Sequence, residues 1–144
     1  NPGINATNRN DAFTGNRTGM AGGGLYLAAG GDTDIFTITN SIFAGNVVTA
    51  TGNPLYAPTG GGLYAIASAL VLQDVDIYGN TGGGAVADTL TMVGGSVYSN
   101  TANIGLNFAG IGGVQALQLT MTDVDVYGNV GDDSGGSQWQ PKYL

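Results

Sequence analysis

The chain lacks cysteine, histidine and glutamate altogether, and it has only three basic residues among 144. Without Cys or His, thiol chemistry, disulfides, His-based acid catalysis and the usual zinc or copper sites are excluded. Ten Asp against three basic residues give a net charge of -7, which opposes binding to the phosphate backbone of nucleic acid. No apolar run approaches the roughly 20 residues of a membrane span. We therefore expect no metal, cofactor, nucleic acid or membrane span.

Glycine is abundant instead, with 27 residues, and a motif that ends in Asn recurs along the chain. The five copies are FTGN, FAGN, IYGN, VYSN and VYGN, ending at Asn16, Asn46, Asn80, Asn100 and Asn129. Glycine clusters that lead into apolar residues follow at variable distance, as GGGLYL from Gly22, GGGLYA from Gly60, GGGAVA from Gly82 and GGVQAL from Gly112. Self-similarity at intervals of tens of residues is typical of repeat architectures.

Four blocks of eleven residues before the last four of these Asn align without gaps: FTITNSIFAGN, LVLQDVDIYGN, LTMVGGSVYSN and LTMTDVDVYGN. Apolar residues alternate within each half of a block, which indicates strands with one buried face. The alternation changes phase at Asn40, Asp74, Gly94 and Asp123, so we expect a bend there that keeps the apolar side inward.

These patterns predict an all-β fold, a single right-handed parallel β-helix of about four coils with three short strands per coil. Its handedness follows from the general preference of parallel crossovers. We expect one domain over 1–144, with an irregular leader at 1–12, coils at 13–137 and a tail at 138–144. Inward Asn at the equivalent bend of each coil would form an internal hydrogen-bonded ladder, a structural role.

The Gly-Gly-apolar starts and the FTGN and FAGN ends resemble the polymorphic outer-membrane protein repeat, which begins with Gly-Gly-apolar and ends with Phe-x-x-Asn. Ile77, Val97 and Val126 replace the Phe in the other three copies. The resemblance spans roughly residues 13 to 137. It implies a bacterial surface or secreted protein, and hence an extracellular or cell-surface location.

The stretches DVDIYGN and DVDVYGN raise the alternative of a calcium site. In the aligned blocks Gly94 and Ser96 separate the two Asp pairs, so the pairs lie two coils apart, roughly 9.6 Å. One ion cannot bridge that distance. Asp74 and Asp123 are then bend residues. Catalysis is not expected either, because Arg9, Arg17 and Lys142 all lie outside the central strand blocks.

Tyr78, Tyr98 and Tyr127 share an outward column, which predicts an aromatic stripe. Such a stripe either stabilises neighbouring strands or binds a partner, with carbohydrate as the ligand class. A weaker alternative is ice binding, suggested by Thr-x-Thr at 37–39 and 120–122.

Two apolar insertions and the tail are candidate subunit contacts. The residues concerned are Leu55, Tyr56, Leu106, Phe108, Trp139, Tyr143 and Leu144. The insertions could equally fold back over the coil between them. Because a β-helix exposes unpaired backbone at both ends, we expect a non-enzymatic extracellular structural protein, a self-assembling subunit of a surface filament or fibre. The alternative is a fragment of an adhesin or passenger domain that binds carbohydrate or a host surface through the tyrosines.

Overall fold

The structure is a computed structural model that describes residues 5–28, 34–49, 59–102 and 111–131. All regular elements in these ranges are β-strands, so the expected all-β fold is observed. The strands are β1 (Asn5–Arg9), β2 (Ala12–Thr14), β3 (Arg17–Thr18), β4 (Leu25–Ala28), β5 (Ile35–Thr39), β6 (Ile42–Ala44), β7 (Val47–Val48), β8 (Leu63–Tyr78), β9 (Ala85–Tyr98), β10 (Val114–Thr122) and β11 (Asp125–Tyr127).

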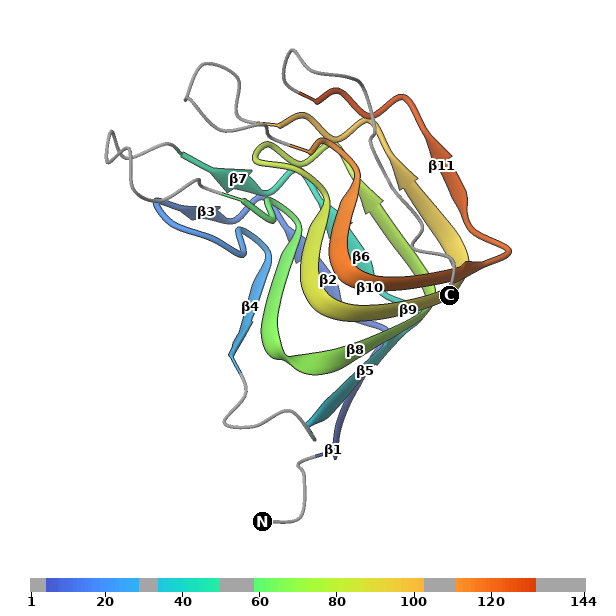
Figure 1. Ribbon diagram of the computed structural model, residues 1–144. Helices are drawn as coiled ribbons and strands as arrows, with labels where there is room; N and C mark the ends of the chain where they lie inside the picture. The colour runs from blue at the N-terminus through green and yellow to red at the C-terminus, as the bar shows by residue number, and fades with distance from the viewer. Residues whose placement is uncertain (1–4, 29–33, 50–58, 103–110, 132–144) are drawn as a thin grey trace.

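Nine of the described strands form one curled sheet in which successive segments of the sequence stack on one another (Figure 1), and β3 and β7 pair in a second sheet. β1, β5, β8, β9 and β10 lie side by side in that order, and each pairs in parallel with the next. We call the stacked segments layers 1 to 5; in chain order they lie within residues 5–18, 21–48, 59–81, 82–102 and 111–131. Layer 1 has no counterpart of β4 among the described residues, so β4 pairs only with β8.

A sharp bend occurs at the same place in every layer. The residues there have positive φ: Asn10 (57°), Asn40 (48°), Asp74 (52°), Gly94 (69°) and Asp123 (53°). Gly, Asn and Asp tolerate this left-handed conformation better than other residues. The bend expected from the phase change of the apolar pattern is therefore confirmed.

The apolar columns of the aligned blocks face the concave side of the sheet and form the core. Leu72, Met92, Ile77 and Val97 are fully buried in layers 3 and 4. Side chains from layers 2 to 4 make up most of this core. The end layers contribute partly buried residues, because each has a neighbouring layer on one side only.

Two details differ from the sequence prediction. Residues 5–12 were expected to be an irregular leader, but they form β1 and the start of β2, paired with β5 and β6. Three short strands were expected per repeat, whereas β8 and β9 continue through the bend. The backbone can do so because pairing between layers resumes immediately on both sides of Asp74.

Candidate functional site

The five repeated Asn form one continuous column through the stack. At each step the backbone N–H and the side-chain Nδ2 of one Asn both donate to Oδ1 of the Asn in the next layer, at 2.8–3.0 Å. Nδ2 also donates backwards, as from Asn80 to the carbonyl of Phe43 at 2.9 Å. Asn46, Asn80 and Asn100 are 0–1% exposed. The column therefore supplies the hydrogen bonds that a polar group buried beside the core requires.

This column has a direction. Asn16, Asn46, Asn80 and Asn100 each donate to Oδ1 of the Asn in the next layer, so the hydrogen bonds between Asn side chains all run the same way. Among the described contacts, Oδ1 of Asn16 accepts no hydrogen bond and the backbone N–H of Asn129 donates none. One end of the stack thus presents an open acceptor, and the other end presents open donors.

A column of glycines lies directly against the Asn column. It consists of Gly24, Gly62, Gly84 and Gly113. A Cβ at Gly84 would lie 2.6 Å from the carbonyl oxygen of Gly113 and 3.1 Å from Nδ2 of Asn100. The glycine clusters and the Asn motifs therefore depend on each other, because a side chain at one of these glycines would displace the Asn packed against it.

The predicted tyrosine stripe is present as a stack of rings. The centroids of Tyr78 and Tyr98 are 4.8 Å apart, and those of Tyr98 and Tyr127 are 5.0 Å apart. Tyr127 is 56% exposed. Desolvation raises the pKa of Tyr98 above its usual 10.0, and charge on Tyr78, Tyr127 and Asp76 raises it further. The raised pKa favours the neutral form of Tyr98, and the ring of Tyr127 at the end of the stack is accessible.

A second, shorter tyrosine stack was not predicted. Tyr26 and Tyr64 lie with ring centroids 5.4 Å apart. Desolvation raises the pKa of Tyr64, and Tyr26 and Asp88 add to the effect. The signal was in the sequence, because both tyrosines follow the glycine cluster in the identical string GGGLY.

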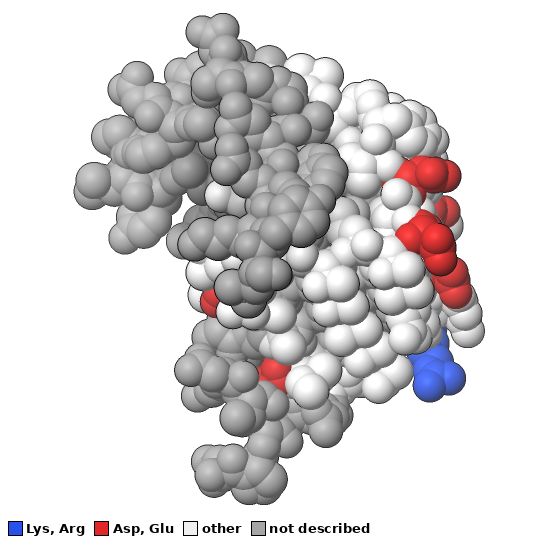
Figure 2. All heavy atoms as spheres, turned by 45° about the vertical axis from the view of Figure 1, so that its right-hand side comes forward, with Lys and Arg blue, Asp and Glu red and all other residues white. Residues whose placement is uncertain are grey.

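Figure 2 shows several acidic groups in a row along one edge of the molecule, with others apart from that row. Asp34 is buried. Asp76 accepts a hydrogen bond from the Ser96 hydroxyl at 2.6 Å, and Ser96 pairs in register with Asp125. Gly94 and Ser96 thus separate the two Asp pairs, as the aligned blocks predicted. The described ranges contain no group of three potential metal ligands.

The outward Thr residues form a less regular array. Thr7, Thr37, Thr91 and Thr120 share a column with Val71. The neighbouring column contains Arg9, Thr39, Gln73, Val93 and Thr122. The second column therefore offers no repeating surface to match a periodic ligand.

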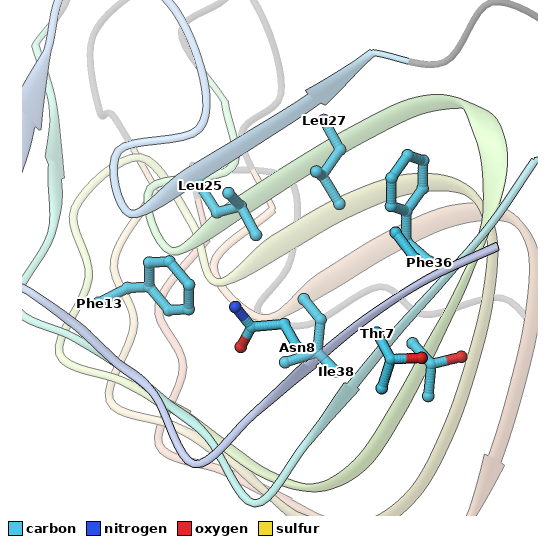
Figure 3. A pocket seen from close by; sticks show the side chains of 9 residues that line it. Thr7, Asn8, Phe13, Leu25, Leu27, Phe36 and Ile38 are labelled. Atoms are coloured by element: carbon cyan, nitrogen blue, oxygen red, sulfur yellow. The ribbon is translucent and has the colours of Figure 1, made fainter. Parts of the chain in front are cut away.

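An open cavity of about 300 Å³ lies at the layer 1 end of the stack, between β1, β2, β4 and β5 (Figure 3). Its wall is mainly apolar and includes Phe13, Leu25, Leu27 and Phe36. Asn8 points into this space from β1, and its Oδ1 is buried without a hydrogen-bond partner. Among the described residues no strand of layer 1 pairs with β4, which leaves this space open. Sequence reasoning missed Asn8 because it assigned this segment to a leader.

The candidate contacts Leu55, Tyr56, Leu106, Phe108, Trp139, Tyr143 and Leu144 lie outside the described residues. Within the described ranges, no helix has the length and apolar character to cross a membrane. Comparison with protein-family models, curated proteins and solved structures finds no match to this chain.

Proposed function

We propose that the chain is a non-enzymatic, extracellular structural protein, a self-assembling subunit of a surface filament or fibre. In this proposal layers 1 to 5, of which layer 1 lacks a described counterpart of β4, belong to a single right-handed parallel β-helix of about four coils. The coils would be similar to polymorphic outer-membrane protein repeats. The parallel pairing of successive segments and the internal Asn column support that architecture.

The observation that carries this proposal is that both ends of the stack leave interior positions uncovered. Val126 is 39% exposed in layer 5, whereas its counterpart Val97 in layer 4 is completely buried. At the other end, Leu25 and Leu27 line the open cavity. Exposed strand edges with apolar side chains are templates for further strand pairing, and a second copy would supply it.

A structural role also fits the placement of the charged groups. Asp74 and Asp123 lie at the bends of their layers, and Asp76 accepts a hydrogen bond from the Ser96 hydroxyl. Both described basic residues, Arg9 and Arg17, lie in layer 1. General acid–base catalysis would need such groups to converge on one point, so the arrangement favours a scaffold.

The direct test is the oligomeric state of the 144-residue chain over a concentration series, by light scattering and negative-stain microscopy. We expect concentration-dependent fibres of uniform width. A chain that stays monomeric throughout the series would disprove self-assembly.

The tyrosine stripe favours a second candidate, an adhesin that binds carbohydrate. Stacked rings with an exposed outer member offer a flat apolar surface, to which sugar rings bind well. Glycan-array binding by the wild type, and its loss in Tyr127→Ala, would support this role. Tyr26→Ala is the matched control, because it shortens the other tyrosine stack.

A further inference from the structure

The two ends of the stack differ in charge. Layer 1 carries Arg9, Arg17 and one acid, Asp11, whereas the described part of layer 5 carries Asp123 and Asp125 and no basic residue. Figure 2 shows the row of acidic groups and a basic group at the end of the same edge. The described ends therefore differ in net charge, with two Arg and one Asp in layer 1 and two Asp in layer 5, and they are electrostatically complementary to each other.

The strand register specifies where these charges would meet. Arg9 shares an outward column with Thr39, Gln73, Val93 and Thr122. If layer 1 of a second copy continued this column at the usual strand spacing of about 4.8 Å, its Arg9 would lie over Thr122. Its guanidinium would then be next to Asp123 and within reach of Asp125.

The hydrogen-bonding groups of the Asn column match in the same register. The open donors of Asn129 would face the open Oδ1 of Asn16 in the second copy. Inside the stack the same contact is made at 2.8–3.0 Å. The interior columns agree as well, because Phe13 would cover the partly exposed Val126.

We propose that layer 5 of one copy binds layer 1 of the next in the register of the chain's own layers, with Asn129 bonded to Asn16 and Arg9 beside Asp123 and Asp125. This inference rests on the proposed self-assembly and specifies its polarity. In this contact β1, β2 and β3 of the second copy would pack on layer 5. The cavity beside β4 would stay open next to the contact.

Two-fold pairing of identical ends is disfavoured by the same groups. Layer 1 against layer 1 would bring two ends of net positive charge together, and layer 5 against layer 5 two acidic ends. Neither pairing offers the open donors of Asn129 to the open acceptor of Asn16. Head-to-tail contacts are heterologous, and they build an open filament when the rotation between copies does not close a ring.

The test exchanges the charges between the two ends. Arg9→Glu makes the layer 1 end acidic, and Asp123→Asn with Asp125→Arg makes the layer 5 end basic; Asn retains tolerance for the positive φ at 123. Each variant alone should associate roughly tenfold or more weakly than the wild type, because like charges now meet. An equimolar mixture should restore fibres, since each end of one variant then meets an opposite charge on the other.

The matched control is Gln73→Glu, which places an acid in the column of Arg9 but in the middle of the stack; it should assemble like the wild type. If the wild type forms fibres and both variants do so equally well, the proposed contact is wrong while self-assembly stands. The contact is also wrong if each variant is blocked and the mixture fails to recover. A wild type that never associates refutes self-assembly itself, and the contact with it. Recovery in the mixture also shows that both variants are folded.

Discussion

At the scale of the residue, the buried Asn side chains make hydrogen bonds that neither an apolar nor a charged side chain could make in their place. Each inner Asn accepts two hydrogen bonds at Oδ1 and donates through Nδ2 in both directions along the stack. A carboxylate would lack the donors, and an aliphatic side chain would leave a backbone N–H of the preceding layer unpaired.

We expect Asn80→Ala to lower the free energy of unfolding by about 3 kcal/mol or more. The change leaves the backbone N–H of Asn46 without a partner, and it removes one hydrogen bond each from Nδ2 of Asn46 and the carbonyl of Phe43. Each unpaired buried group costs about 1–3 kcal/mol. Asn16→Ala is the control, because Asn16 is exposed and only donates; its cost should be about 1 kcal/mol. Urea unfolding measures both, and equal losses would contradict this account of the column.

Asn8 is the opposite case, a polar residue in an interior column without a partner for Oδ1. Its neighbours in that column are Ile38, Leu72, Met92 and Met121. Asn8→Leu should raise the free energy of unfolding by about 1 kcal/mol, because it removes a buried unpaired carbonyl and lines the cavity with apolar surface. Asn8→Asp should lower it in the same urea experiment. A stabilised Asp variant would show that the site accommodates charge, against this reasoning.

At the scale of the element, the repeated motifs predicted the register between layers 2 to 5, but they did not predict the first strand of the stack, β1. The four gapless blocks placed Leu70, Leu90 and Leu119 in one column, and the strands pair in that way. The segment of β1 was missed because its inward positions are Ala6 and Asn8, which carry no apolar alternation. β1 is placed in the sheet by its backbone pairing with β5, which the pattern of apolar and polar side chains does not reveal.

The glycine column gives a prediction at this scale. Gly84→Ala should destabilise the fold by about 2–3 kcal/mol, because its Cβ would press on the Gly113 carbonyl and the Asn100 amide. Gly79→Ala is the matched control: it sits at φ 62° but meets only one atom, at 3.9 Å. It should cost about 1 kcal/mol, the penalty of the left-handed conformation alone. Thermal and urea unfolding compare the two, and a costlier Gly79→Ala would refute the packing argument.

The tyrosine stripe predicts a loss of stability in alkali. Desolvation and the neighbouring tyrosines raise the pKa of folded Tyr98 above its usual 10.0. A raised pKa stabilises the fold at pH below 10.0, and that contribution disappears as the pH rises through the folded-state pKa. Urea midpoints should therefore fall between about pH 8 and about pH 11. The fall in the urea midpoint should be smaller in Tyr98→Phe. If the midpoint falls equally with pH in both proteins, Tyr98 ionises as freely in the fold as in the unfolded chain.

At the scale of the whole molecule, the inner layers of the stack are held more firmly than the layers at its two ends. Layers 2 to 4 have neighbours on both sides and hold the fully buried side chains, whereas layers 1 and 5 have one described neighbour each. In a stack of this kind each layer is stabilised mainly by contact with the next, so opening begins at the ends. The surface that limits the stability of a single copy is thus the surface that a second copy would cover.

Hydrogen exchange should reveal this gradient and its dependence on association. At low concentration we expect the slowest amide exchange in β8 and β9 and the fastest in β1 and β11, because exchange from an inner strand requires the outer layers to open first. At concentrations where the chain associates, β1 and β11 should gain protection together, since head-to-tail contact covers both ends at once. Mass spectrometry at two concentrations measures this, with Arg9→Glu as the unassembled control. Protection that increases at one end only would indicate pairing of identical ends and contradict the head-to-tail contact.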